Sequence, residues 1–166
     1  MLDADHLIEL AQTLVNARGV GAPRQVVLRR AVSTAYYAVF HVPCGTIAET
    51  FVSAGVWKSR VLFYRSLDHG KTKDRCKKLG QKPLPNKEKI FFEAQAFGQE
   101  LRDFANTFVQ LQELRHQSDY DPDYRLTKAL AQQCIDDASK AMADLNSAGD
   151  QERNKFLAYI LFDIRS

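Results

Sequence analysis

The fold is decided by the stretch NKEKIFFEAQAFGQELRDFANTFVQLQELRHQS, residues 86–118. Apolar side chains recur in it at intervals that alternate between four and three residues, which is the spacing of the buried seam of a bundle helix. These side chains are Ile90, Ala94, Phe97, Leu101, Phe104, Phe108 and Leu111. The spacing predicts one long helix from Asn86 to Ser118, with Asn86 as its N-cap.

Arg115 stands in this seam at the position where the next apolar side chain is expected. Removing an unpaired guanidinium from water costs several kcal/mol, so an arginine in an apolar seam needs partners. The nearest candidates are the carboxylates of Asp119 and Asp121 and the phenol of Tyr120, all just downstream. Arg115 is therefore the first candidate functional residue.

The rest of the chain also has the periodicity of helices, and its length of 166 residues predicts one domain over 1–166. The expected helices run from Asp3 or Asp5 to Gly19, from Pro23 and Arg24 towards Val52, over 56–67, over 71–79, from Thr127 to Leu145 and from Asp150 to Ile164. Pro43 lies inside the second of these, where it predicts a kink or a break. No stretch has the alternation of a strand, so the sequence predicts an all-α, up-and-down helical bundle of about five to seven helices.

Composition narrows the class of protein. The three cysteines, Cys44, Cys76 and Cys134, are far apart and form no CxxC pair, which favours reduced thiols and a cytoplasmic location. No apolar run approaches the roughly 18 residues of a membrane span, so we expect no contact with a membrane.

The sequence also lacks an HExxH motif, a phosphate-cradling glycine loop and a nucleophile elbow, and we expect no metal and no cofactor.

Positive charge is concentrated between Lys58 and Lys89, where eleven Lys or Arg residues stand against three Asp or Glu. The net charge of this segment is +8, whereas the whole chain carries only +3. Such a patch attracts phosphate-rich partners through counterion release, although a charge run of this kind also fits a solvated pair of short helices. The candidates for holding RNA are Lys71, Lys73, Arg75, Lys77 and Lys78.

The second helix carries two neighbouring ridges of polar and aromatic residues, opposite a conventional apolar stripe. The candidate binding residues on these ridges are Arg29, Arg30, Ser33, Tyr36 and Tyr37. Guanidinium and hydroxyl groups bind phosphate, and tyrosine rings offer flat surfaces to a base. His41 lies on the Tyr37 ridge and is a candidate for proton transfer. The alternative is that Tyr36 and Tyr37 are large packing residues whose hydroxyls reach the surface, and that Arg29 and Arg30 are solvated.

Three short segments resemble the HEPN superfamily, and most closely its branch of small bacterial proteins. They are LRRAVSTAYYAVFH (28–41), LDHG (67–70), and LR followed by SDYD (114–115 and 118–121). All three segments occur in the order and at the helical spacing that the family has. The resemblance covers nearly the whole chain. It implies an up-and-down helical bundle that forms a homodimer, often as the toxin beside a minimal nucleotidyltransferase that acts as its antitoxin.

Active members of that family build a metal-independent ribonuclease site across the dimer from an Arg, a polar residue and a His four to six positions further on. Arg115 followed by His116 resembles the first half of this motif, whereas Tyr120 stands where the His would be. A tyrosine, whose usual pKa is about 10, is a poor base at neutral pH but can donate a proton or orient a phosphate. His116 points about 100° around the helix from Arg115, so it can serve only if the helix unwinds there.

Two hypotheses follow for the function. In the first, the protein binds RNA or a nucleotide and cleaves RNA without a metal, with Arg115 stabilising the phosphate, and His41 or His116 moving protons. Asp119 and Tyr120 then orient the guanidinium. In the second, the protein is a non-catalytic interaction module, in which the same arginine and the tyrosine ridge of the second helix build a dimer or partner interface.

Overall fold

The computed structural model describes residues 2–17, 24–52, 56–81, 84–89, 92 and 97–164. Within these residues the chain forms eight helices and no strand, so the all-α prediction is confirmed. The helices are α1 (Ala4–Asn16), α2 (Gln25–Phe51), α3 (Trp57–Tyr64), α4 (His69–Leu79), α5 (Asn86–Lys89), α6 (Gln99–Tyr120), α7 (Lys128–Ser147) and α8 (Asp150–Leu161). The expected number of five to seven is exceeded because the predicted helix from Asn86 is divided into α5 and α6.

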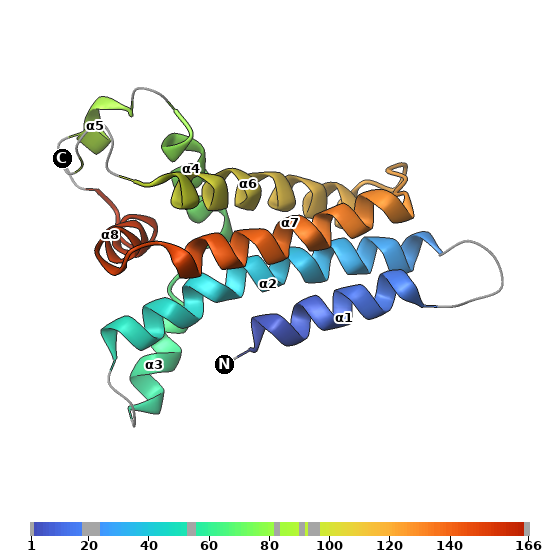
Figure 1. Ribbon diagram of the computed structural model, residues 1–166, viewed down its shortest axis with the longest axis horizontal. Helices are drawn as coiled ribbons and strands as arrows, with labels where there is room; N and C mark the ends of the chain where they lie inside the picture. Colours follow the sequence, from blue (N-terminus) through green and yellow to red (C-terminus); the bar gives the residue numbers. More distant parts are fainter. Residues whose placement is uncertain are drawn as a thin grey trace.

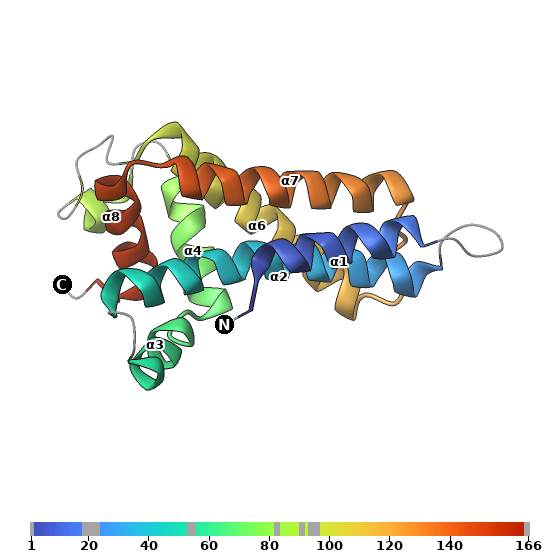
Figure 2. The same cartoon turned by 60° about the horizontal axis from the view of Figure 1, so that its bottom comes forward.

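Four long helices form the bundle, and α2 lies at its centre. The helices α1, α6 and α7 pack along α2, and α7 also contacts α1 and α6. Successive long helices run in opposite directions, as Figure 1 shows, which confirms the up-and-down arrangement. The shorter helices α3, α4, α5 and α8 gather at the end of the bundle where α2 ends and α6 begins (Figure 2).

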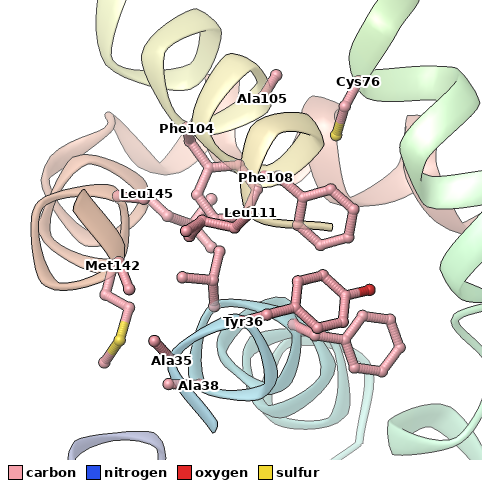
Figure 3. Packing of buried hydrophobic residues seen from close by; sticks show 14 of the residues in the cluster. Ala35, Tyr36, Ala38, Cys76, Phe104, Ala105, Phe108, Leu111, Met142 and Leu145 are labelled. Carbon is pink, nitrogen blue, oxygen red and sulfur yellow. The ribbon is translucent and has the colours of Figure 1, made fainter. Parts of the chain in front are cut away.

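In the centre of α2, side chains are buried on two sides of the helix. One side is the predicted apolar stripe, and the other is the ridge that contains Ser33, Tyr36 and Phe40. Ser33, Tyr36 and Phe40 are all buried, and Tyr36 is fully inaccessible. The Tyr36 ring packs 5.7 Å from the ring of Phe108 in α6, and Figure 3 shows both inside the core. Because α6 covers this ridge, Tyr36 presents no ring face to a base, and its assignment as a base-stacking residue is corrected to a core position.

Pro43 does not break α2, which continues to Phe51. Of the two predicted effects of Pro43, a kink or a break, the break is therefore excluded, and the kink stays a prediction. A proline removes one hydrogen bond from the helix, but Phe40, Cys44 and Ile47 around it are buried in the core, and this packing holds the helix together. Gly19 and Pro23, which were expected to end the first helix and begin the second, lie outside the described residues.

The predicted helix from Asn86 to Ser118 is not continuous. α5 ends after four residues at Lys89, and α6 begins only after Gly98, its N-cap, whose backbone is extended. Phe97 is buried but precedes the helix, with its ring 6.2 Å from that of Phe156 in α8. The rest of the predicted seam is confirmed, because Leu101, Phe104, Phe108 and Leu111 of α6 are buried. Ile90 and Ala94 lie outside the described residues.

Helix caps follow the sequence closely. The carboxylate of Asp3 caps α1, and the hydroxyl of Thr127 caps α7, as predicted. Asp68 caps α4 by accepting a hydrogen bond from a backbone N–H of the first turn, so α4 begins earlier than expected. Gly149 rather than Asp150 precedes α8, and the carboxylate of Asp150 belongs to its first turn.

The described helices lack the features of membrane spans and of metal sites. None of them is both long and apolar enough to cross a bilayer. Over the same residues, no three His, Cys, Asp or Glu side chains gather into a group that could hold a metal ion. Cys44, Cys76 and Cys134 are buried free thiols, and burial raises the pKa of the Cys44 thiol to about 12.

Candidate functional site

Arg115 lies near the C-terminal end of α6, and two groups hold its guanidinium. Nη2 donates a hydrogen bond of 2.9 Å to the Tyr37 hydroxyl on α2. Nε forms an ion pair of 2.7 Å with Oδ2 of Asp119, one turn further along α6. The predicted pairing of Arg115 with Asp119 is therefore observed, and Tyr37 adds a partner from the neighbouring helix. The side chain of Arg115 remains 22% exposed, so the charge is not sealed inside the bundle.

Three tyrosine rings surround this guanidinium. Its central carbon lies 6.0 Å from the ring centre of Tyr36 and 5.5 Å from the ring centres of Tyr37 and Tyr120. A cation near the face of an aromatic ring is stabilised by about 0.5–1 kcal/mol at exposed sites and by more where water is excluded. The tyrosines therefore help to offset the desolvation of a charge in an apolar seam.

Asp119 and Arg29 join the same end of α6 to α2. The Ser33 hydroxyl donates a hydrogen bond to Oδ1 of Asp119. The guanidinium of Arg29 donates to three backbone carbonyls at the end of α6 and in the turn that follows it. These are the carbonyls of Ser118 (2.9 Å), Pro122 (3.2 Å) and Tyr124 (2.5 Å). The observed contacts of Arg29 are thus with the chain itself. The bond to Ser118 satisfies a carbonyl in the last turn of α6, where a helix leaves its carbonyls unpaired.

His69, in the first turn of α4, completes the cluster. Its Nδ1 lies 2.6 Å from the Tyr36 hydroxyl, and its ring stacks on Phe40 with the ring centres 3.7 Å apart. Burial raises the pKa of the Tyr36 phenol far above its usual value, so this hydroxyl stays protonated. In the sequence, His69 stands out only as part of the LDHG segment (67–70), and no chemical role is predicted for it. Its position directly after the capping Asp68 was the available signal.

His41 lies one turn beyond Tyr37 on α2. Its Nδ1 is 2.8 Å from the Tyr64 hydroxyl of α3, and the two rings are nearly parallel, at 4°. The Tyr37 ring stacks against His41 with the centres 6.2 Å apart, and it meets His69 edge-on at 6.0 Å. Tyr37 therefore contacts Arg115 through its hydroxyl and packs near both imidazoles through its ring.

Burial lowers the pKa of both imidazoles below the usual value. For His41, burial is the largest cause, and a charge on His69 lowers the pKa further. For His69, burial comes first and the positive charge of Arg115 second, while Asp68 acts in the opposite direction. Both histidines are therefore neutral at pH 7, and a proton on His69 opposes a proton on His41.

His116 could act beside Arg115 only if the helix unwound there, and the structure does not show this. The helix α6 is continuous to Tyr120, so it does not unwind near His116. The exposed imidazole packs on the ring of Tyr120 instead, with the ring centres 4.9 Å apart. Tyr120 is itself 64% exposed, and its observed contacts are with His116 and with the guanidinium of Arg115.

Each of the five cations of α4 forms an ion pair with a carboxylate. They are therefore less available to bind an external phosphate than the local charge of +8 in the sequence suggests. The pairs are Lys73–Glu113 and Lys77–Glu113 (3.3 Å each), Lys71–Asp163 (3.2 Å), Arg75–Asp163 (3.3 Å) and Lys78–Glu88 (3.1 Å). Glu113 and Asp163 come from outside the basic segment. Three carboxylates shared by five cations still leave an excess of positive charge on this face.

The structure thus brings seven of the fifteen predicted site residues into one cluster, together with His69, and leaves the others outside it. One cluster contains Ser33, Tyr36, Tyr37, His41, His69, Arg115, Asp119 and Tyr120. Arg30 is exposed on α2, and its guanidinium has no hydrogen bond or ion pair within the part of the chain that the structure describes. The α4 cations begin two residues after His69 and extend along α4 away from the cluster.

No family model matches the chain, and neither the curated proteins nor the solved structures contain a match.

Proposed function

We propose that the protein binds RNA at the cluster around Arg115 and cleaves it without a metal ion, as the resemblance to the HEPN superfamily suggests. The observation that carries this proposal is the arrangement around Tyr37. Its hydroxyl accepts a hydrogen bond from Arg115, and its ring packs near two imidazoles, those of His41 and His69. One side chain thereby links a phosphate-binding cation to two groups that can transfer protons.

The two imidazoles suit the chemistry of RNA cleavage. Attack by the 2′-hydroxyl needs a base to take its proton and an acid to protonate the leaving oxygen. Burial lowers the pKa of both imidazoles, and a charge on His69 lowers the pKa of His41 further, so the neutral form of each ring is favoured. A neutral imidazole can take the proton of the 2′-hydroxyl, and an imidazole that carries a proton can give it to the leaving oxygen. Nδ1 of each ring is engaged by a tyrosine, which leaves Nε2 for the substrate.

Arg115 is proposed to stabilise the charge that develops on the phosphate. A guanidinium has five N–H donors, and within the described residues only Nε and Nη2 have partners. Nη1 is left to donate to a phosphate oxygen while Asp119 and Tyr37 hold the side chain in place. The α4 cations, with their excess of positive charge, are proposed to attract the RNA backbone.

The resemblance also supports a biological setting for this activity. We propose that the protein acts as a homodimer and is the toxin component of a toxin–antitoxin or defence pair. The proposed partner is an antitoxin of the nucleotidyltransferase type.

The test is cleavage of a labelled RNA pool in the presence of EDTA by the wild-type protein, Arg115→Ala, His69→Gln and His41→Gln. Removing a donor to transition-state charge costs roughly 100-fold or more in rate, and we expect at least this loss for Arg115→Ala. Arg125→Ala is the matched control, because Arg125 is exposed and bonds only to a carbonyl of its own turn, that of Pro122. Thermal unfolding confirms that each variant is folded.

Cleavage that persists in a folded Arg115→Ala variant would contradict the proposal, as would a folded wild-type protein that cuts no RNA. The second outcome favours the other candidate function, a non-catalytic interaction module. One observation supports that candidate: Arg115, Arg29 and all five α4 cations are engaged in contacts within the chain. Such a module is expected to bind a partner protein with the folded Arg115 network intact.

A further inference from the structure

A small polar cavity lies between α4, α5 and the segment that follows α8. Its volume is about 190 Å³. Four cations line it, together with two carboxylates; these side chains are Lys71, Arg75, Lys78, Lys87, Asp74 and Glu88. Lys71, Arg75 and Lys78 are among the α4 cations that the proposed function uses to attract RNA, whereas no residue of the cluster around Arg115 lines this cavity.

Arg75 is held rigidly at one wall of the cavity. Its side chain is only 13% exposed, and its guanidinium carbon lies 5.0 Å from the ring centre of Tyr159. Its Nη2 also donates a hydrogen bond of 3.2 Å to the backbone carbonyl of Phe162. A guanidinium that is oriented in advance loses little conformational entropy when it binds an anion.

Lys78 is fixed at the same cavity by a buried acid. The carboxylate of Glu88 is almost inaccessible, at 2% exposure, and it forms an ion pair of 3.1 Å with Lys78. The Tyr159 hydroxyl donates a further hydrogen bond to Glu88. Glu88 therefore neutralises Lys78. The charge that faces the cavity is then set by three cations, Lys71, Arg75 and Lys87, and by the carboxylate of Asp74.

The carboxylate of Asp163 pairs with two of the cations that line this cavity, Lys71 and Arg75. Its Oδ2 lies 3.2 Å from Nζ of Lys71, and its Oδ1 lies 3.3 Å from Nη2 of Arg75, one helical turn further along α4. Two oxygens of one carboxylate thus bridge two cations, which is the arrangement that two oxygens of a phosphate also satisfy. The Asp163 side chain is 64% exposed, so it can leave without disturbing the core.

We infer that this cavity binds a phosphoryl group, a phosphomonoester or a pyrophosphate, and that the carboxylate of Asp163 competes with it as an internal occupant. A dianion with three or more oxygens matches Lys71, Arg75 and Lys87 better than a single carboxylate does. The cavity is smaller than the usual size of pockets that enclose a drug-sized molecule, so the base and ribose of a nucleotide would remain outside. The phosphoryl group can belong to a free nucleotide or to the 5′ end of an RNA.

The test measures binding of pyrophosphate to the full-length protein by calorimetry at low ionic strength. Asp163→Asn removes the competing carboxylate and is expected to tighten binding about fivefold, because an exposed ion pair is weak. Asp150→Asn is the matched control, since it changes the net charge equally but removes an ion pair with Arg153 on α8. We expect it to alter the affinity less than about twofold.

Two variants test the cations themselves. Arg75→Gln is expected to weaken binding about tenfold or more, since it removes a charged donor. Lys87→Gln changes an exposed side chain, so it tests the cavity even if Arg75→Gln fails to fold. A decrease in affinity with Lys87→Gln supports the site, and wild-type affinity in that variant would overturn it. Equal shifts for Asp163→Asn and Asp150→Asn would also overturn it, because only the overall charge would then matter.

The source of the phosphoryl group is decided by comparing a mononucleotide with short RNAs that carry either a 5′-phosphate or a 5′-hydroxyl. Tighter binding of the 5′-phosphorylated RNA than of the mononucleotide assigns the site to RNA ends, and the reverse assigns it to nucleotides. No binding of any phosphorylated probe at about 10 mM would overturn the inference. Arg115→Ala is expected to bind pyrophosphate normally, so this inference and the proposed cleavage fail separately.

Discussion

Arg115 Nη2 donates a hydrogen bond of 2.9 Å to the hydroxyl of Tyr37, a residue 78 positions earlier in the chain. This bond joins α6 to α2 at the point where a charged side chain enters an apolar seam. It also connects the guanidinium to the ring that packs near both imidazoles of the cluster. The contact therefore has a structural role that can be measured independently of any activity.

Replacing Tyr37 with Phe tests this bond, because the ring remains and only the hydroxyl is lost. Hydrogen bonds to charged groups contribute about 1.5–3 kcal/mol, and the partial exposure of Arg115 reduces the expected loss to about 1 kcal/mol in the free energy of unfolding. Urea denaturation measures it. Tyr124→Phe is the control, since the Tyr124 hydroxyl has no hydrogen bond within the described residues. Equal stability of Tyr37→Phe and the wild type would show that water replaces the bond at no cost.

Asp119→Asn removes the negative charge beside Arg115 and weakens the contact with Ser33. We expect a loss of about 1 kcal/mol in the free energy of unfolding, because this partly exposed pair is supported by a hydrogen bond from another helix. The loss should shrink in 1 M salt, which screens the pair. Asp123→Asn, at an exposed position without an ion pair in the described chain, should change stability little. A salt-independent loss would instead indicate a steric effect of the amide.

The half-buried histidines His41 and His69 predict how stability depends on pH. The pKa values of His41 and His69 are lower in the folded protein than in the unfolded chain, where the value is about 6.5. The unfolded state therefore binds more protons as the pH falls. The stability contributed by the neutral imidazoles is complete above about pH 7 and is lost as the pH falls through 6.5 towards the folded values.

Replacing His69 with Gln should flatten this dependence. The measured quantity is the difference in the free energy of unfolding between about pH 7.5 and pH 5.5, and it should be smaller in the variant than in the wild type. His116→Gln, which changes an exposed imidazole, should keep the wild-type difference. If His69→Gln also keeps it, the pH dependence arises elsewhere in the chain.

The helices and most of their ends are determined by the sequence itself. Helix capping joins residues two or three positions apart, as at Asp3 and Thr127, and the buried seam of α6 follows from a spacing of three and four residues. The ion pair of Arg115 with Asp119 also belongs to this class, because the two residues are one helical turn apart. Interactions of such short range can be read from the order of the residues.

The contacts that join different helices at the site were decided only by the tertiary structure. His69 and Tyr36 are 33 positions apart, and Lys71 and Asp163 are 92 positions apart, so no local pattern predicts that they meet. No local pattern predicts, either, that the ridge of α2 with Ser33, Tyr36 and Phe40 is buried, because its burial results from α6 packing over it. A helical pattern states which residues share a face, whereas the choice of the faces that meet depends on packing the whole chain into one core.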